Sequence, residues 1–301
     1  MSCLQTVLTT VINEYLFDST QLQNNTVCLV WDDFDFDPVF TLSGQFVILR
    51  SSESVFVEAA IGKTFCERFV LLGNITIPFL HTFVKAVIKV NWRAWENSMV
   101  IVANNFSDDL LSHRIVKEIP DILFLKITDC CIFEAYTSKY ISLYSEIPEE
   151  LYLLDIFNGT DFQDGIYLFP NKKENFNGRI VRIGLFDYLP FSIFFKDSEN
   201  GNAFINESGV IQKYFLDGTE GSMLTTYCKK YNCSIEIIRC AYGEWGTVFS
   251  NLSGEGVMGM VAENKADISF NALYTWDNIY PYCGMSRYMS RSGITFLIPG
   301  P

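Results

Sequence analysis

Short runs of β-branched and aromatic residues alternate along this chain with stretches whose apolar residues recur at helical spacing. Before residue 170, strands are expected at 27–31, 46–50, 54–59, 98–104 and 121–128. Helical spacing lies between them at 81–90 and 107–119, and the second stretch opens with Ser107, a residue type that suits a helix start. Because helices between strands return the chain across the sheet in the same direction, this alternation predicts an α/β domain with a largely parallel sheet.

A polar stretch without periodicity, FPNKKENFNG at 169–178, is the best candidate for a linker. After it the same alternation resumes, with a strand at 179–186, a turn around Pro190, a helix at 218–232, a strand at 233–240, and a helix leading into a strand by residue 270. Charge separates the two parts, since residues 1–175 hold 12 Lys and Arg against 23 Asp and Glu, whereas 176–301 hold 10 against 12. We therefore expect two α/β units, 1–175 and 176–301.

The composition of the chain limits which binding partners and which cellular compartment it can have. The formal charge of −13 excludes a nucleic-acid partner, because such binding needs Lys and Arg to neutralise phosphates. An excess of Asn-x-Ser/Thr sequons predicts a glycosylated, extracellular chain, with acceptors at Asn24, Asn74, Asn105, Asn158, Asn206, Asn232 and Asn251. Nine cysteines suit an oxidising compartment and leave at least one thiol unpaired, although free thiols in a cytosolic protein are the alternative.

Neither end of the chain supplies a membrane span. The first 17 residues lack the basic start of a signal sequence and are expected to form an amphipathic helix of a folded domain. No apolar run approaches the roughly 18–20 residues that a membrane-spanning helix requires.

Motifs for cofactor or metal chemistry are weak. GEGVMG at 254–259 has the glycine spacing of a dinucleotide site, but it follows turn-like residues and carries Glu255, so the glycines are expected to form a helix entry. The two histidines, His81 and His113, belong to no local zinc or triad signature. We predict no cofactor, no metal site and no catalytic residues.

Four aromatic residues follow predicted strands of the second unit: Tyr188, Trp245, Tyr274 and Trp276. In α/β sheets, ligands bind in the crevice outside the carboxyl ends of strands, so the four are expected to line a pocket there. The alternative is that each of them packs in a core.

From residue 179 onward the chain resembles the first ligand-binding segment of ionotropic glutamate receptors, most closely the divergent chemosensory ionotropic receptors of arthropods. The resemblance lies in VRIGLFDYLPFS (181–192), LDGTEGSMLTTYCKKYN (216–232), EWGTVFSNLSGEGVMGMVAENKADISFNALYTW (244–276) and MSRYMSRSGITFLIPGP (285–301). It covers about 120 of 301 residues. It implies one lobe of a periplasmic-binding-protein-like clamshell, with a buried strand at 268–270 leading to its lip. Residues 1–175 would then be the amino-terminal domain, where only the architecture is similar.

Departures from the family pattern concern the ligand. Where the family places a proline, a threonine and a carboxylate-binding arginine, this chain has Ala272, Tyr274 and Ile279, and Trp245 takes the place of the tyrosine that stacks on glutamate. The resemblance therefore implies a small organic ligand, with amines and other odorants or tastants as candidates, in place of glutamate. The candidate contacts are Tyr188, Trp245, Tyr274, Thr275, Trp276 and Ile279.

The resemblance also implies a cellular role. The chain is expected to be the extracellular part of a ligand-gated cation channel subunit in the plasma membrane, a fragment that lacks the pore and that assembles with other subunits into a heteromeric, tetrameric channel. The alternatives are a soluble clamshell solute-binding protein and, more weakly, an enzyme with an unrecognised site.

Overall fold

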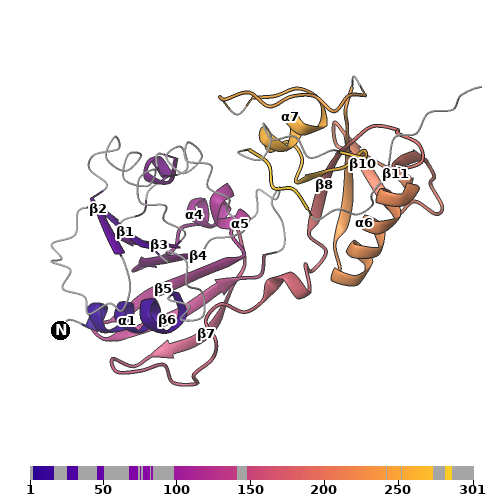
Figure 1. The fold of residues 1–301 in the computed structure, drawn as a ribbon. Helices are drawn as coiled ribbons and strands as arrows, with labels where there is room; N and C mark the ends of the chain where they lie inside the picture. The colour runs from indigo at the N-terminus through magenta and orange to yellow at the C-terminus, as the bar shows by residue number, and fades with distance from the viewer. Residues whose placement is uncertain are drawn as a thin grey trace, which may run out of the picture. The chain divides into compact units, whose positions relative to one another are not determined.

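The computed structural model describes residues 3–16, 26–32, 46–50, 68–73, 75, 77–81, 83, 98–140, 148–241, 243–251, 253–273 and 282–286 (Figure 1). The chain divides into two compact units, each with its own sheet. The first unit comprises Met1–Ile180 with Thr226–Ser234, and the second comprises Val181–Thr225 with Ile235–Pro301. Both are α/β units, as the alternation predicts. The domain boundary expected between residues 175 and 176 stays a prediction.

The first unit contains a seven-stranded sheet in the order β2-β1-β3-β4-β5-β6-β7. Its strands are β1 (Val27–Asp32), β2 (Phe46–Arg50), β3 (Arg68–Gly73), β4 (Ser98–Ala103), β5 (Asp121–Asp129), β6 (Ile132–Ser138) and β7 (Leu151–Phe157). Strands β1 to β5 pair in parallel with their neighbours, and β6 and β7 add antiparallel pairs at one edge. The largely parallel sheet is thus confirmed. The strand expected at 54–59 and most of the helix expected at 81–90 lie outside the described residues.

Helices cover both faces of this sheet. Alternate residues of β3 point to opposite faces: Phe69 and Leu71 join one apolar cluster, and Val70 and Leu72 join the other. One face is covered by α1 (Cys3–Val11) and the short π-helix that continues it (Ile12–Leu16), as the amphipathic start of the chain predicts. The other face is covered by residues 77–81 and 83 together with α4 (Asp108–Ser112) and α5 (Arg114–Glu118).

The single helix expected at 107–119 is wrong, because His113 interrupts it. His113 has an extended backbone (φ −65°, ψ 136°), which ends α4, and its Nδ1 accepts a hydrogen bond from the backbone N–H of Ile115, which starts α5. The helix start predicted at Ser107 is confirmed, since its Oγ accepts from the N–H of Leu110.

The stretch expected to be a linker is anchored on the first unit. It contains the 3₁₀ helix η3 (Lys172–Glu174), and the Lys172 Nζ donates to the carbonyl of Pro120 and to the Thr137 hydroxyl, at 2.6 and 2.7 Å. Burial lowers the pKa of Lys172 to about 8. These contacts fix the segment that leads to the strand beginning at Ile180.

The second unit contains a six-stranded sheet in the order β13-β8-β12-β10-β11-β9. This part of the chain forms β8 (Ile180–Leu185), β9 (Ile193–Lys196), β10 (Ala203–Glu207), β11 (Val210–Asp217), α6 (Gly218–Tyr231), β12 (Ser234–Arg239), α7 (Gly256–Ala262) and β13 (Ile268–Ser269). Helix α6 is divided between the units, since its residues from Thr226 onward belong to the first unit. Parallel pairs join β8 to β13 and β10 to β12, whereas β9, β10 and β11 form an antiparallel meander. The sequence predicted the elements β8, α6, β12 and α7 and did not predict the meander.

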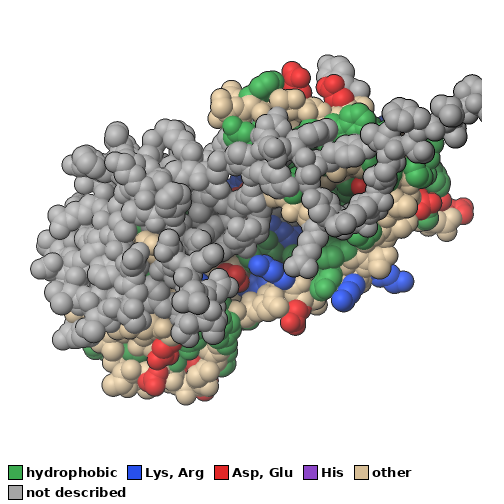
Figure 2. Space-filling model, in the orientation of Figure 1, with side chains coloured by type: hydrophobic (Ala, Val, Ile, Leu, Met, Phe, Trp, Pro, Cys, Tyr) green, Lys and Arg blue, Asp and Glu red, His purple; other side chains and the backbone are tan. Residues whose placement is uncertain are grey.

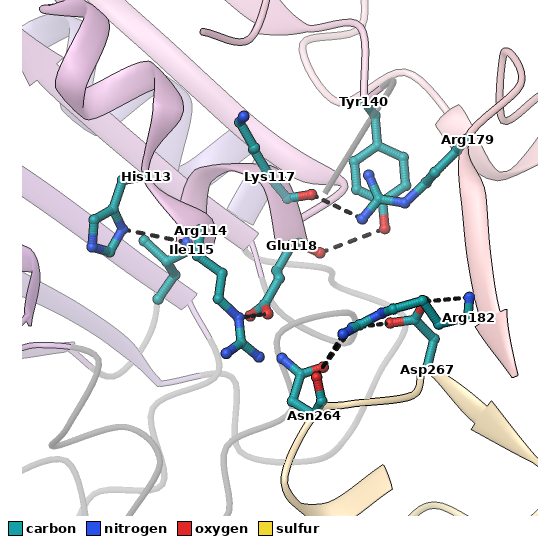
Figure 3. A network of polar contacts seen from close by, with 10 residues as sticks. All are labelled: His113, Arg114, Ile115, Lys117, Glu118, Tyr140, Arg179, Arg182, Asn264 and Asp267. Atoms are coloured by element: carbon teal, nitrogen blue, oxygen red, sulfur yellow. Dashed lines mark hydrogen bonds and ion pairs between the residues drawn. The ribbon is translucent and has the colours of Figure 1, made fainter. Parts of the chain in front are cut away.

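The buried strand expected at 268–270 is wrong in length and burial. Strand β13 has only two residues, and Ile268 is 40% exposed because β13 is the last strand of the sheet order. The turn before it is held by Arg182 of β8, whose guanidinium binds both carboxylate oxygens of Asp267 and two oxygens of Asn264 (Figure 3). Arg182 therefore fixes the approach of the chain to β13.

Two disulfides are described in full, and all four of their cysteines belong to the first unit. Cys3 is bonded to Cys131, which ties α1 to the turn between β5 and β6, and Cys228 is bonded to Cys233. Cys28 is also in a disulfide, and three free thiols are described, those of Cys130, Cys240 and Cys283. None of the helices in the described part of the chain is both long enough and apolar enough to cross a bilayer.

Candidate functional site

Tyr188 and Trp245 follow different strands of the second unit and meet at one edge of its sheet. Tyr188 lies in the turn after β8, and Trp245 lies in the loop after β12. Their ring centroids are 5.3 Å apart with an interplanar angle of 78°, and Phe186 contacts Trp245 edge-on at 5.8 Å. Both Tyr188 and Trp245 are half-buried. We call this group of rings the aromatic cluster.

Hydrogen bonds between its own residues hold the turn that carries Tyr188. The N–H of Tyr188 donates to the Ser192 carbonyl at 2.8 Å, and the Ser192 hydroxyl donates to the Phe186 carbonyl at 2.9 Å. Ser192 is fully buried. Phe191 stacks on Tyr188 with centroids 5.8 Å apart. These contacts hold the Tyr188 ring against Trp245.

Asn271 connects the loop after β13 to the aromatic cluster. Its side chain is fully buried, and its Nδ2 donates to the Phe186 carbonyl at 2.5 Å and to the Ser192 hydroxyl at 2.6 Å. In return, the indole N–H of Trp245 donates to the Asn271 carbonyl at 2.8 Å. The Asn271 Oδ1 is buried and has no hydrogen-bond partner among the described residues. One asparagine thus joins the loops that follow β8, β12 and β13.

Glu220 reaches the same loop from the first turn of α6. Its carboxylate oxygens accept from the N–H of Ala272 at 3.0 and 3.2 Å. Burial raises the pKa of Glu220, and the backbone N–H groups of Ala272 and Asn271 oppose that rise. Ala272 has a φ of 51°, a left-handed conformation that is uncommon for a residue with a side chain. The carboxylate therefore holds an unusual turn in place.

Close backbone contacts explain the glycines of GEGVMG. Gly256 has a φ of 62°, and a Cβ there would lie 2.5 Å from the backbone nitrogen of Gly246. A Cβ at Gly254 would similarly lie 2.6 Å from the Cα of Gly259. The N–H of Met258 then donates to the Trp245 carbonyl at 3.0 Å. The spacing thus packs the start of α7 against the loop that carries Trp245, as the expected helix entry requires.

Several predicted site residues lie outside the described residues. They are four candidate ligand contacts, Tyr274, Thr275, Trp276 and Ile279, and the two sequon asparagines Asn24 and Asn74. The other five sequon asparagines are all exposed: Asn105, Asn158, Asn206, Asn232 and Asn251. In two of these sequons the hydroxyl donates to the asparagine Oδ1, from Thr160 to Asn158 and from Ser253 to Asn251.

The described site suits recognition of a small molecule. It combines aromatic faces, a carboxylate and a buried amide oxygen at the carboxyl ends of β8 and β13. Both histidines of the chain belong to the first unit, so the second unit has no imidazole that could act as a base for the Ser192 hydroxyl. Among the described residues, no three His, Cys, Asp or Glu side chains are placed to bind a metal ion.

Sequence reasoning missed Asn271 and Glu220. A polar residue directly after an apolar strand run, as in ISFNAL, is the signal that could have identified Asn271. The chain matches no protein-family model and no curated protein.

Proposed function

We propose that the second unit is the ligand-recognition lobe of a receptor subunit related to ionotropic glutamate receptors, of the divergent chemosensory type. The observation that supports this proposal most is the convergence of Tyr188 and Trp245 beside the Asn271 loop. Residues from three different loops meet where α/β sheets bind their ligands. The resemblance in the segments that carry these residues points to the same place.

In this proposal the aromatic cluster receives a small organic ligand, and closure of an opposing lobe over it opens a cation channel. The subunit would act at the extracellular side of the plasma membrane, within a heteromeric, tetrameric channel. An exposed apolar side chain beside the cluster suits such a closing surface, since Leu189, next to Tyr188 in the chain, is 72% exposed. Figure 2 shows hydrophobic side chains reaching the surface of the second unit among polar ones.

Expression of the receptor together with candidate partner subunits tests the proposal. Ligand-evoked currents should vanish in Trp245→Ala while the amount of receptor at the cell surface is unchanged. Phe195→Ala is a matched control, because Phe195 is 51% exposed on β9 and stacks on Phe215. Full currents in Trp245→Ala would contradict the proposal, and ligand binding by a secreted protein without any current would favour the solute-binding alternative.

A further inference from the structure

Glu220 places a partly buried negative charge next to the aromatic cluster, and no positive partner for it is found in the described part of the chain. Its described contacts are backbone N–H groups, and none of the ion pairs among the described residues includes it. Two N–H groups leave lone pairs of a carboxylate unused. A carboxylate withdrawn from water is unfavourable unless a cation or further donors meet it. A positive charge from outside the unit would therefore stabilise the Glu220 carboxylate.

The Asn271 Oδ1 adds a second acceptor for which the described residues provide no donor. Its amide orientation follows from its neighbours: the Phe186 carbonyl can only accept, so the Nδ2 must face it and the Oδ1 must face away. Asn271 is fully buried, and an unsatisfied oxygen there is unfavourable. The loop after β13 thus carries an excess of acceptors over donors.

The acceptors and the rings belong to one site. The Trp245 indole donates to the carbonyl of Asn271, and the next residue, Ala272, donates to Glu220. Aromatic faces attract cations, and a carboxylate binds an ammonium group by charge-assisted hydrogen bonds. An anionic ligand would instead be repelled by Glu220. The carboxylate, the buried amide oxygen and the aromatic faces therefore all favour a positively charged ligand.

We infer that the site recognises a small organic ammonium ion, with Glu220 as its counter-charge and with Tyr188 and Trp245 as its aromatic contacts. The inference rests on the proposed function, since it specifies the ligand of the same site. It assigns to Glu220 a role in ligand specificity, in addition to the hydrogen bonds by which Glu220 positions the loop after β13.

Titration of the full chain with three matched probes tests this inference. The probes are pentylammonium, 1-pentanol and pentanoate, which share one alkyl chain and differ in charge. Binding is followed by tryptophan fluorescence in about 150 mM KCl, which screens the general attraction of an acidic protein for cations. We expect pentylammonium to bind at least about tenfold more tightly than 1-pentanol, and pentanoate to bind most weakly.

Two variants test whether the charge of Glu220 causes the preference for pentylammonium. Glu220→Gln keeps an oxygen for the Ala272 N–H but removes the charge, so the preference for pentylammonium over 1-pentanol should disappear. Glu207→Gln, at an exposed residue of β10, should keep the preference. Circular dichroism checks that both variants fold, and if Glu220→Gln does not, the ranking of the three probes with the unmodified chain decides.

The outcomes separate this inference from the proposed function. Equal binding of pentylammonium and 1-pentanol, abolished by Trp245→Ala, would overturn the inference and leave the proposed function intact. Preference for pentanoate, or a preference for pentylammonium that survives in folded Glu220→Gln, would also overturn the inference. Saturable binding of none of the probes up to about 100 mM would count against both.

Discussion

Replacing Arg182 by methionine should destabilise the second unit strongly. The Arg182 side chain is 9% exposed and makes four hydrogen bonds, two to Asp267 and two to Asn264. Removing one partner of a buried ion pair costs about 3–5 kcal/mol, because the other charge is left without compensation. Asp267 is 30% exposed and keeps the N–H of Arg182, so water compensates part of this loss. We therefore expect Arg182→Met to lower the free energy of unfolding by about 3 kcal/mol, the lower end of that range.

Urea unfolding followed by circular dichroism measures this loss, and hydrogen exchange of the β8 and β13 amides assigns it to the second unit. The matched control is Lys265→Met, which removes a cation from the pair with Glu263 in the same turn. Lys265 is 65% exposed, and such a pair contributes about 0–1 kcal/mol. A change below about 1 kcal/mol in Arg182→Met would refute the argument that this pair positions the turn before β13.

Three further predictions concern other parts of the chain. Burial lowers the pKa of His113, and the nearby His81 and Arg114 lower it further. Because the unfolded chain then binds more protons than the folded one, the free energy of unfolding should fall as the pH drops from about 7 to about 5. His113→Asn should remove this contribution while keeping a cap for α5. Gly256→Ala should lower the melting temperature far more than Gly209→Ala, because both glycines have positive φ but only Gly256 faces a backbone contact. Secreted material should shift in mobility on glycosidase digestion, and Asn158→Gln and Asn251→Gln should each remove part of that shift.

Helices and strands whose apolar residues form a distinct run or recur at regular spacing were predictable from the sequence, whereas strands that lack such a pattern were not. β1, β4, β5 and α6 lie within one or two residues of their expected bounds, since each is a distinct apolar run or an amphipathic stretch. β3 was missed because RFVLLG merges with a longer apolar stretch that periodicity cannot assign to helix or strand.

The missed hairpin of β10 and β11 carries a signal that was available. Glu207 pairs with Val210, and the two residues between them, Ser208 and Gly209, have φ values of 52° and 88°. Positive φ at both turn positions matches the tight turn that joins antiparallel strands. Ser-Gly between alternating residues, as in FINESGVIQ, could therefore have predicted this hairpin.

The site was predictable where it depends on sheet direction alone. Tyr188 and Trp245 each follow a strand, and strands that run in parallel bring such residues to one edge. Asn271 and Glu220 depend on contacts between residues 85 and 52 positions apart, which no local pattern encodes. Sequence thus indicated that Tyr188 and Trp245 lie at one edge and missed the polar groups that connect them, and ligand binding by these rings stays a prediction.

The conformation of Ala272 bears on which ligand this loop can serve. Under the proposed relation to ionotropic glutamate receptors, a proline would stand at this position, and proline fixes φ near −65° and has no N–H. Ala272 has a φ of 51° and donates its N–H to Glu220, so neither its backbone conformation nor its hydrogen bond is available to a proline. The N–H of Ala272 needs an acceptor, and the Glu220 carboxylate supplies it. A loop built in this way brings a negative charge to the site, which favours a ligand of the opposite charge over one that carries a carboxylate.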